Sequence, residues 1–192
     1  MRHRYDTRGI VLSRSPLGEA SVFVTILTSS LGMVRARAQS VRSPGAKLAA
    51  ALTTLTESSL ILVRGREGWR VAGAVPEESW FIRLPDAASR ERVARVIGLL
   101  LRLVAGESPD PSLFPIMRGY MDALASLPEE VHEAAEVLVV LRMLEALGLA
   151  ASDESPVGGD PAEFSPALLA KISEKRAIHI ARINRGISAS GL

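Results

Sequence analysis

Cysteine is absent from this chain of 192 residues, and aromatic residues are scarce. Without cysteine the chain forms no disulfide, no thiolate zinc site and no cysteine-based catalytic centre. This composition fits a reducing compartment. The eight aromatic residues leave few rings for stacking against a ligand. Apolar residues nevertheless make up 47% of the chain, which predicts a folded protein with a substantial core.

Long apolar runs are also missing. The two most apolar stretches, residues 93–105 and 134–150, are interrupted by charged residues such as Arg102 and Arg142. Neither stretch is therefore expected to span a bilayer. No apolar run follows the charged opening MRHRYDTRG, which argues against a signal peptide. The sequence predicts a cytoplasmic protein.

No constellation of catalytic residues is visible. The three histidines, His3, His132 and His179, lie far apart, and none has a second ligand at metal-binding spacing. The glycine-containing stretch at residues 64–68 lacks the lysine of a phosphate-binding loop. We therefore expect a non-enzymatic protein without a cofactor or a bound metal.

Charge is distributed unevenly along the chain. Residues 1–83 hold twelve Arg and Lys against six Asp and Glu, a net charge of +6. Residues 84–192 hold eleven against fifteen, a net charge of −4. A basic first part joined to an acidic second part suggests a different partner for each.

The basic part is centred on residues 31–48, LGMVRARAQSVRSPGAKL. Small apolar residues alternate there with arginines, which predicts a half-buried strand with a charged face. Guanidinium groups bind phosphate oxygens bidentately, so this face and the loop after it suit a nucleic-acid backbone. The alternative is a solvated strand face followed by a polar turn. The candidate DNA contacts are Arg35, Arg37, Arg42 and Lys47, with Arg14 on the neighbouring strand as a fifth.

The first 78 residues predict five short strands and one short helix. The strands are expected at residues 7–14, 19–28, 34–39, 53–63 and 69–75, and the alanine-rich helix at residues 46–52. This count and helix position fit a five-stranded OB-fold barrel. An SH3-like barrel and an open meander are the alternatives.

From residue 79 to residue 192 the apolar residues recur at helical spacing. Helices are expected within residues 86–106, 111–124, 128–148 and 165–183, separated from one another by prolines, glycines and a loop at residues 151–164. The third helix is apolar on nearly all sides, so we expect it at the centre of a bundle. The fold class is therefore α+β, an all-β domain followed by an all-α domain.

The first 55 residues resemble the opening of RecO, the bacterial recombination mediator. The matching features are GIVL at residues 9–12, GEAS at residues 18–21, TxxxGxVR at residues 28–35 and LAAAL at residues 48–52. The resemblance implies an OB-fold, a helical domain, and binding and annealing of single- and double-stranded DNA. It also implies a nucleoid-associated location, and partnership with RecR and with the C-terminal tail of single-stranded-DNA-binding protein.

Two departures from the family pattern stand out. Gln39 and Ser40 occupy the place of a lysine-glycine pair, which removes one expected phosphate contact. Many members carry a zinc-binding cysteine insertion after the third helix, whereas residues 151–164 contain no cysteine. No zinc is therefore expected.

Three aromatic residues are candidates for stacking on bases, namely Phe23, Tyr5 and Trp69. Phe23 lies opposite the apolar face of the second strand, so it is expected either to stack a base or to pack beneath the helical domain. Few rings and many arginines predict binding that tolerates different sequences and weakens with salt. An RNA-binding protein and an adaptor that binds no nucleic acid are the alternative functions.

The last predicted helix suggests a peptide-binding groove. Its apolar residues, among them Leu168, Ile172 and Ile180, spread beyond one narrow stripe. A cationic rim around an apolar floor suits an acidic peptide that ends in a hydrophobic residue. The alternative is that these residues close the bundle. The candidate rim residues are Lys171, Lys175, Arg176 and Arg182.

Overall fold

The structure is a computed structural model that describes residues 3–19, 21–39, 48–104, 106–150 and 159–191. The described residues form two compact units. The barrel unit comprises residues 1–83 and 106–114, and the helical unit comprises residues 84–105 and 115–192. The segment at residues 106–114 thus belongs with the barrel, although it follows a helix of the other unit.

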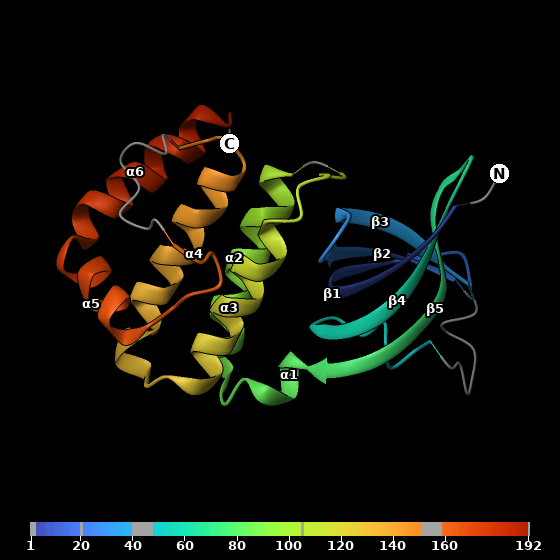
Figure 1. The fold of residues 1–192 in the computed structure, drawn as a ribbon, viewed down its shortest axis with the longest axis horizontal. Coiled ribbons are helices and arrows are strands. Elements are labelled where there is room, and N and C mark those ends of the chain that lie inside the picture. Colours follow the sequence, from blue (N-terminus) through green and yellow to red (C-terminus); the bar gives the residue numbers. More distant parts are fainter. Residues whose placement is uncertain (1–2, 20, 40–47, 105, 151–158, 192) are drawn as a thin grey trace. The chain divides into compact units, whose positions relative to one another are not determined.

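Five strands close into a barrel in the order β1-β2-β3-β5-β4, as predicted for an OB-fold (Figure 1). β3 pairs with β5 in parallel, and the other neighbouring strands pair antiparallel. The strands are β1 (His3–Leu17), β2 (Ser21–Thr28), β3 (Gly32–Ala38), β4 (Thr56–Gly65) and β5 (Gly68–Ser79).

The alternation expected around the two arginines is confirmed in β3. Val34, Ala36 and Ala38 are buried in the barrel, whereas Arg35 and Arg37 are exposed. Val24 and Ile26 of β2 are also buried in this core. Residues that alternate with a period of two place every second side chain in the apolar interior, where burial stabilises the barrel.

The helix predicted at residues 46–52 is wrong for the described residues 48–52, which form turns. One helix-like bond remains, from the Leu52 amide to the Leu48 carbonyl at 3.1 Å. Ala51 and Leu52 are fully buried, and the Ser58 hydroxyl donates to the Ala51 carbonyl at 2.7 Å. Tertiary packing therefore outweighs the helix propensity of the alanines.

A short helix, α1 (Trp80–Arg83), follows β5 and ends the first part of the barrel unit. The Trp80 indole is fully buried and donates to the Glu57 carboxylate at 3.2 Å. Glu57 is itself buried and forms an ion pair with Arg8. This buried charge is thus satisfied from two sides, as a carboxylate inside a protein requires.

The segment at residues 106–114 is attached to the start of β3. Met33 and Ser108 exchange two backbone hydrogen bonds, of 2.7 and 3.0 Å. Gly32, next to Met33, has a φ of +68°, and a Cβ atom there would lie 2.0 Å from the Ser108 carbonyl oxygen. Only glycine therefore allows this close approach.

The helical unit is built around α4, which is buried on nearly all sides, as predicted. Its neighbours α2, α5 and α6 pack against it. The predicted last helix is divided in two, because the backbone leaves the helical conformation at Lys175. The helices of this part are α2 (Ala87–Leu103), α3 (Leu113–Ser126), the 3-10 helix η1 (Glu129–Val131), α4 (His132–Ala146), α5 (Pro166–Glu174) and α6 (Arg176–Ala189).

Candidate nucleic-acid interface

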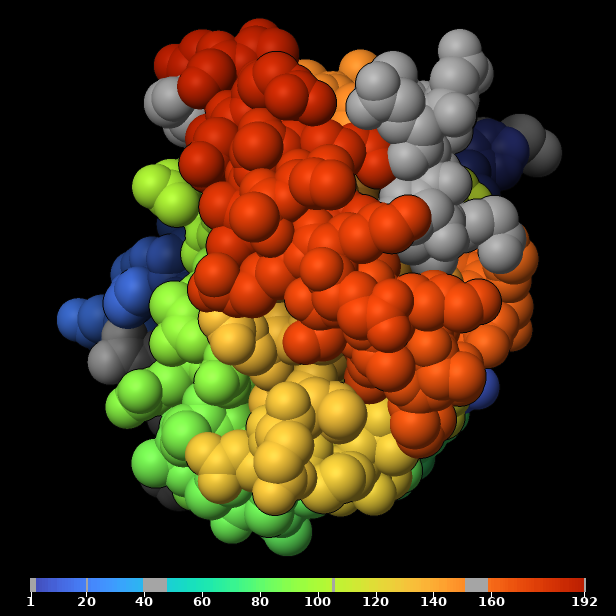
Figure 2. Space-filling view, turned by 90° about the vertical axis from the view of Figure 1, so that its left-hand side faces the viewer, coloured from blue at the N-terminus to red at the C-terminus, as the bar shows by residue number. Residues whose placement is uncertain are grey.

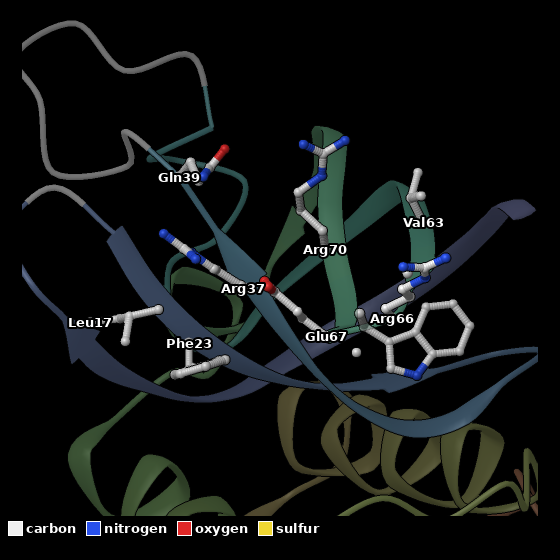
Figure 3. A pocket seen from close by; sticks show the side chains of 11 residues that line it. Leu17, Phe23, Arg37, Gln39, Val63, Arg66, Glu67 and Arg70 are labelled. Carbon is white, nitrogen blue, oxygen red and sulfur yellow. The ribbon is translucent and has the colours of Figure 1, made fainter. Parts of the chain in front are cut away.

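An open groove of about 770 Å³ lies on the barrel unit, between β3 and the β4–β5 hairpin (Figure 3). We call it the strand groove. Its surface combines apolar side chains with three arginines and one glutamate. The lining residues are Leu17, Phe23, Arg37, Gln39, Val63, Gly65, Arg66, Glu67, Gly68, Trp69 and Arg70.

Four of these residues form one row across the barrel. Phe23 of β2 is the register partner of Arg37, and Arg37 of β3 is the register partner of Arg70. Arg70 of β5 is in turn the partner of Val63 on β4. Register partners point to the same face of a sheet, so the row presents two guanidinium groups between two apolar side chains on the outside of the barrel.

Several arginines of the barrel unit have carboxylate partners, but within the described residues the groove arginines do not. Arg4 pairs with Asp6 at 3.1 Å, Arg64 pairs with Glu107 at 2.9 Å, and Arg8 pairs with two glutamates. In the part of the chain that the structure describes, no carboxylate pairs with the groove arginines Arg37, Arg66 and Arg70. These cations are available to an anionic ligand.

Phe23 is half-buried, and the Arg35 guanidinium lies 4.5 Å from the centre of its ring. A cation over an aromatic face is attracted by the ring quadrupole. Arg35 therefore covers the Phe23 ring, which was predicted as a candidate for stacking on a base. A base that stacked on Phe23 would have to displace the guanidinium or stack on its plane.

Tyr5 and Trp69 lie together on the barrel surface. Their ring centres are 5.2 Å apart in an edge-to-face arrangement, and the Arg64 guanidinium lies 4.9 Å from the Trp69 ring. Trp69 lines the strand groove and packs against the barrel core. Of these two stacking candidates, Trp69 contributes to the groove surface.

Arg14 is exposed on β1 but is not among the residues that line the groove. A bulge between Val11 and Ser13 shifts the register, so that Arg14 becomes the partner of the core residue Val24. In the strand alternation Arg14 is therefore in register with side chains that point into the barrel, whereas Arg37 is in register with side chains that point outward. The other two predicted contacts, Arg42 and Lys47, lie outside the described residues.

Comparison with known proteins identifies a family for this barrel. The family description "Recombination protein O N terminal" matches residues 1–75. A DNA repair protein RecO from Heliobacterium modesticaldum is 32% identical over 147 residues, which cover 75% of this chain and 51% of that protein. The chain belongs to the RecO family.

Two further RecO proteins are also similar to this chain. The Gloeobacter violaceus protein is 27% identical over 169 residues, covering 84% of this chain and 64% of that protein. The Acaryochloris marina protein is 39% identical over 80 residues, covering 42% and 27%. The chain spans about half the length of the first RecO relatives that it matches.

Two groove arginines, Arg66 and Arg70, were missed by the sequence reasoning. Arg66 lies in the hairpin turn and Arg70 follows on β5, both within RGREGWR, a stretch that holds three arginines in seven residues. The density of arginines in this stretch of the RecO barrel could have indicated a further basic surface. Their position beside Arg37, however, follows from the parallel pairing of β3 with β5, which joins segments far apart in sequence.

The four residues of the predicted peptide rim in the RecO helical domain differ in their exposure to solvent. Lys171 and Lys175 are exposed, whereas Arg182 is buried and cannot belong to a solvated rim. Arg182 lies on the side of α6 that faces the bundle, together with the buried His179. Arg176 is exposed and binds the Glu133 carboxylate at 2.9 Å.

A groove of about 380 Å³ does lie between α2, α4 and α6 of the helical unit. Ile180 and Ile183 of α6 and Val137 of α4 form part of its apolar floor, and Arg176 stands at its edge. Figure 2 shows this side of the unit, with the start of α4 (yellow) visible between α2 (green) and α6 (red). Ile178 points away from the groove and is 61% exposed.

Among the residues that the structure describes, no group of three His, Asp or Glu side chains could hold a metal ion. His132 binds the Leu127 carbonyl at 2.9 Å, and His179 is buried in the bundle. In the same described ranges, no helix combines the length and the apolar character needed to cross a bilayer.

Proposed function

We propose that this chain binds a single DNA strand in the strand groove and acts as a non-enzymatic mediator of DNA repair and recombination. The observation that carries the proposal is the set of groove arginines, Arg37, Arg66 and Arg70, for which the described residues supply no carboxylate partner. Guanidinium groups without internal partners are favourable sites for phosphate oxygens. Membership of the RecO family supports DNA as the ligand.

The lining of the groove favours a single strand over a duplex. A duplex presents phosphates on its outside and keeps the faces of its bases stacked in its interior. The apolar side chains of the groove, Leu17, Phe23, Val63 and Trp69, would then contact no base face. An unpaired strand can place phosphates on Arg37 and Arg70 and lay bases against these apolar side chains.

Annealing follows from contacts of this kind without a catalytic residue. A strand held mainly through its phosphates keeps base edges accessible to a complementary strand. We extend the proposal, on family membership, to the loading of recombinase on DNA coated by single-stranded-DNA-binding protein and to partnership with RecR. Double-stranded DNA would be the product of annealing and a weaker ligand of the groove.

The helical unit would take the C-terminal tail of single-stranded-DNA-binding protein. The groove between α2, α4 and α6 supports this part of the proposal, since its floor is apolar and Arg176 stands at its edge. An acidic peptide would compete with Glu133 for Arg176 and place a terminal apolar residue on Ile180 and Ile183. Replacement of Ile183 by Asp should abolish binding of a labelled tail peptide.

Fluorescence anisotropy with a labelled single-stranded DNA tests the main proposal. Arg37→Ala combined with Arg70→Ala should weaken binding about tenfold or more, because two charge-assisted contacts are lost. Arg14→Ala is the matched control, since Arg14 is exposed but lies outside the groove. Equal effects of the double and control variants would contradict a specific groove.

Competition with RNA of the same sequence separates the alternative functions. Stronger competition by RNA than by unlabelled DNA would favour an RNA-binding protein. Absence of binding to either polymer at micromolar concentrations would leave a protein-interaction adaptor.

A further inference from the structure

Glu67 brings a carboxylate into a groove that is otherwise cationic. It occupies the tip of the β4–β5 hairpin with Arg66, between the paired residues Gly65 and Gly68. Figure 3 shows its side chain extending from the hairpin into the strand groove, while the terminal nitrogens of Arg37 and Arg70 point away from it. A negative charge here opposes phosphate binding, so its presence in a DNA groove calls for an explanation.

The carboxylate is not used to neutralise a groove arginine. Within the described ranges, no ion pair joins Glu67 to Arg37, Arg66 or Arg70, although all three line the same groove. Other glutamates of the barrel unit, Glu57 and Glu107 among them, do pair with arginines. The Glu67 oxygens are therefore available to accept hydrogen bonds from a ligand.

The two kinds of charge divide the groove. Phosphates are attracted to the row of Arg37 and Arg70, whereas at the hairpin tip the charge of Glu67 offsets that of the adjacent Arg66. A strand bound with its phosphates on that row directs base edges toward the carboxylate. A carboxylate accepts hydrogen bonds from amino groups and repels carbonyl oxygens.

Bases differ in the hydrogen-bonding groups on the edge that stays exposed in the major groove when they form Watson–Crick pairs. Cytosine and adenine present amino hydrogens there, whereas thymine and guanine present carbonyl oxygens. A contact to this edge leaves the pairing edge accessible, which is compatible with annealing.

We propose that Glu67 is a specificity-determining residue that makes the strand groove prefer cytosine and adenine over thymine and guanine. The proposal rests on the function proposed above, since it requires a single strand in this groove. It adds a preference among bases to binding that the arginines alone would leave independent of sequence.

Two single-stranded probes test it, an oligocytidine and an oligothymidine, each of about twelve nucleotides to match the site size of an OB-fold. At pH 8 and low salt the unaltered protein should bind the cytosine strand about fivefold more tightly. Glu67→Gln should bind the thymine strand more tightly than the unaltered protein does, because the repulsion of phosphate is removed. Glu67→Ala should bring the ratio of the two dissociation constants close to one.

Glu19→Gln is the matched control, because Glu19 is an exposed carboxylate of the barrel unit outside the groove lining. It should keep the preference for cytosine. If Arg37→Ala and Arg70→Ala weaken binding but Glu67→Ala leaves the ratio unchanged, the specificity role is wrong and the proposed function stands. If the unaltered protein binds neither strand, both proposals are wrong.

Discussion

Arg37 on β3 and Arg70 on β5 are direct register partners in the parallel pairing of these two strands. Both side chains are exposed on the outer face of the barrel, and neither has a carboxylate partner among the described residues. Like charges placed side by side on a sheet repel each other. A phosphate between them would relieve the repulsion, so the pair favours an anionic ligand.

The first prediction concerns the salt dependence of DNA binding. Each phosphate contact on a single strand contributes about 0.7 to the slope of log affinity against log salt. Arg37→Ala with Arg70→Ala should therefore reduce the slope by about 1.4. Titrations of a labelled strand at several salt concentrations measure it, with Arg14→Ala as control. An unaltered slope in the double variant would move the DNA site away from the groove.

The sequence predicts those features of the site that are set by residues close together along the chain, and misses those that depend on residues far apart along it. Arg35 and Arg37 could be assigned to one strand face because the alternation that defines it is local. Arg70 could not be placed beside them, because its position depends on a pairing between separate segments. The position of Arg14 outside the groove could not be predicted either, because it depends on the bulge between Val11 and Ser13, for which the sequence gives no clear signal.

The fold likewise could be predicted where it follows from local sequence patterns, and not where it depends on contacts between separate segments. Apolar periodicity predicted the central helix α4 and the five strands, because each pattern is set by which side chains are buried. The break at Lys175 between α5 and α6 was missed, because no proline or glycine marks it. The position of residues 106–114 in the barrel unit was likewise hidden, since it depends on the backbone bonds of Met33 and Ser108.

A second prediction tests that attachment. Gly32→Ala places a Cβ atom 2.0 Å from the Ser108 carbonyl oxygen at a residue with a φ of +68°. The expected cost is about 3 kcal/mol in the free energy of unfolding, since backbone strain adds to the loss of the bonds between Met33 and Ser108. Urea denaturation measures it.

Gly18→Ala is the control for this substitution. Gly18 has a similar φ of +65°, but apart from its chain neighbours no described residue lies within 4 Å of the added Cβ atom. Its cost should be about 1 kcal/mol, from the backbone alone. Equal costs at the two glycines would show that the contact with residues 106–114 adds no stability.

The third prediction concerns pH. Burial lowers the pKa of His179 below 6.5, and the positive charges of Arg182 and Lys175 act in the same direction. The unfolded chain therefore takes up a proton at a higher pH than the folded chain does. The free energy of unfolding should be insensitive to this group above its unfolded-state pKa and should fall as the pH decreases from 6.5 toward the folded-state pKa.

Denaturation at pH 7.5 and pH 5.5 tests the contribution of His179. His179→Leu removes the titrating group and should flatten the pH dependence, since its ring nitrogens have no hydrogen-bond partner among the described residues. His3→Ala, at an exposed position, should leave the dependence as it is. A His179→Leu protein with the original pH dependence would assign the effect to other groups.

The last prediction concerns Arg142, a buried cation of the central helix α4. Its Nη1 atom donates to the carbonyl oxygens of Pro161 and Glu163, at 2.9 and 2.6 Å, and its guanidinium lies 4.9 Å from the Phe164 ring. Burial lowers the pKa of Arg142. The side chain therefore fastens the chain before α5 to the bundle.

Replacing a buried charge by an apolar group can be neutral when the partners can be satisfied in another way. Here the partners are two backbone carbonyls, and Arg142→Met would leave both without this donor. We expect a loss of about 2–3 kcal/mol in the free energy of unfolding and faster amide exchange in residues 162–165. Arg185→Ala, on the exposed side of α6, should change neither quantity. If Arg142→Met is as stable as the unaltered protein, residues 159–165 are held by their apolar contacts, and the carbonyls are satisfied by water.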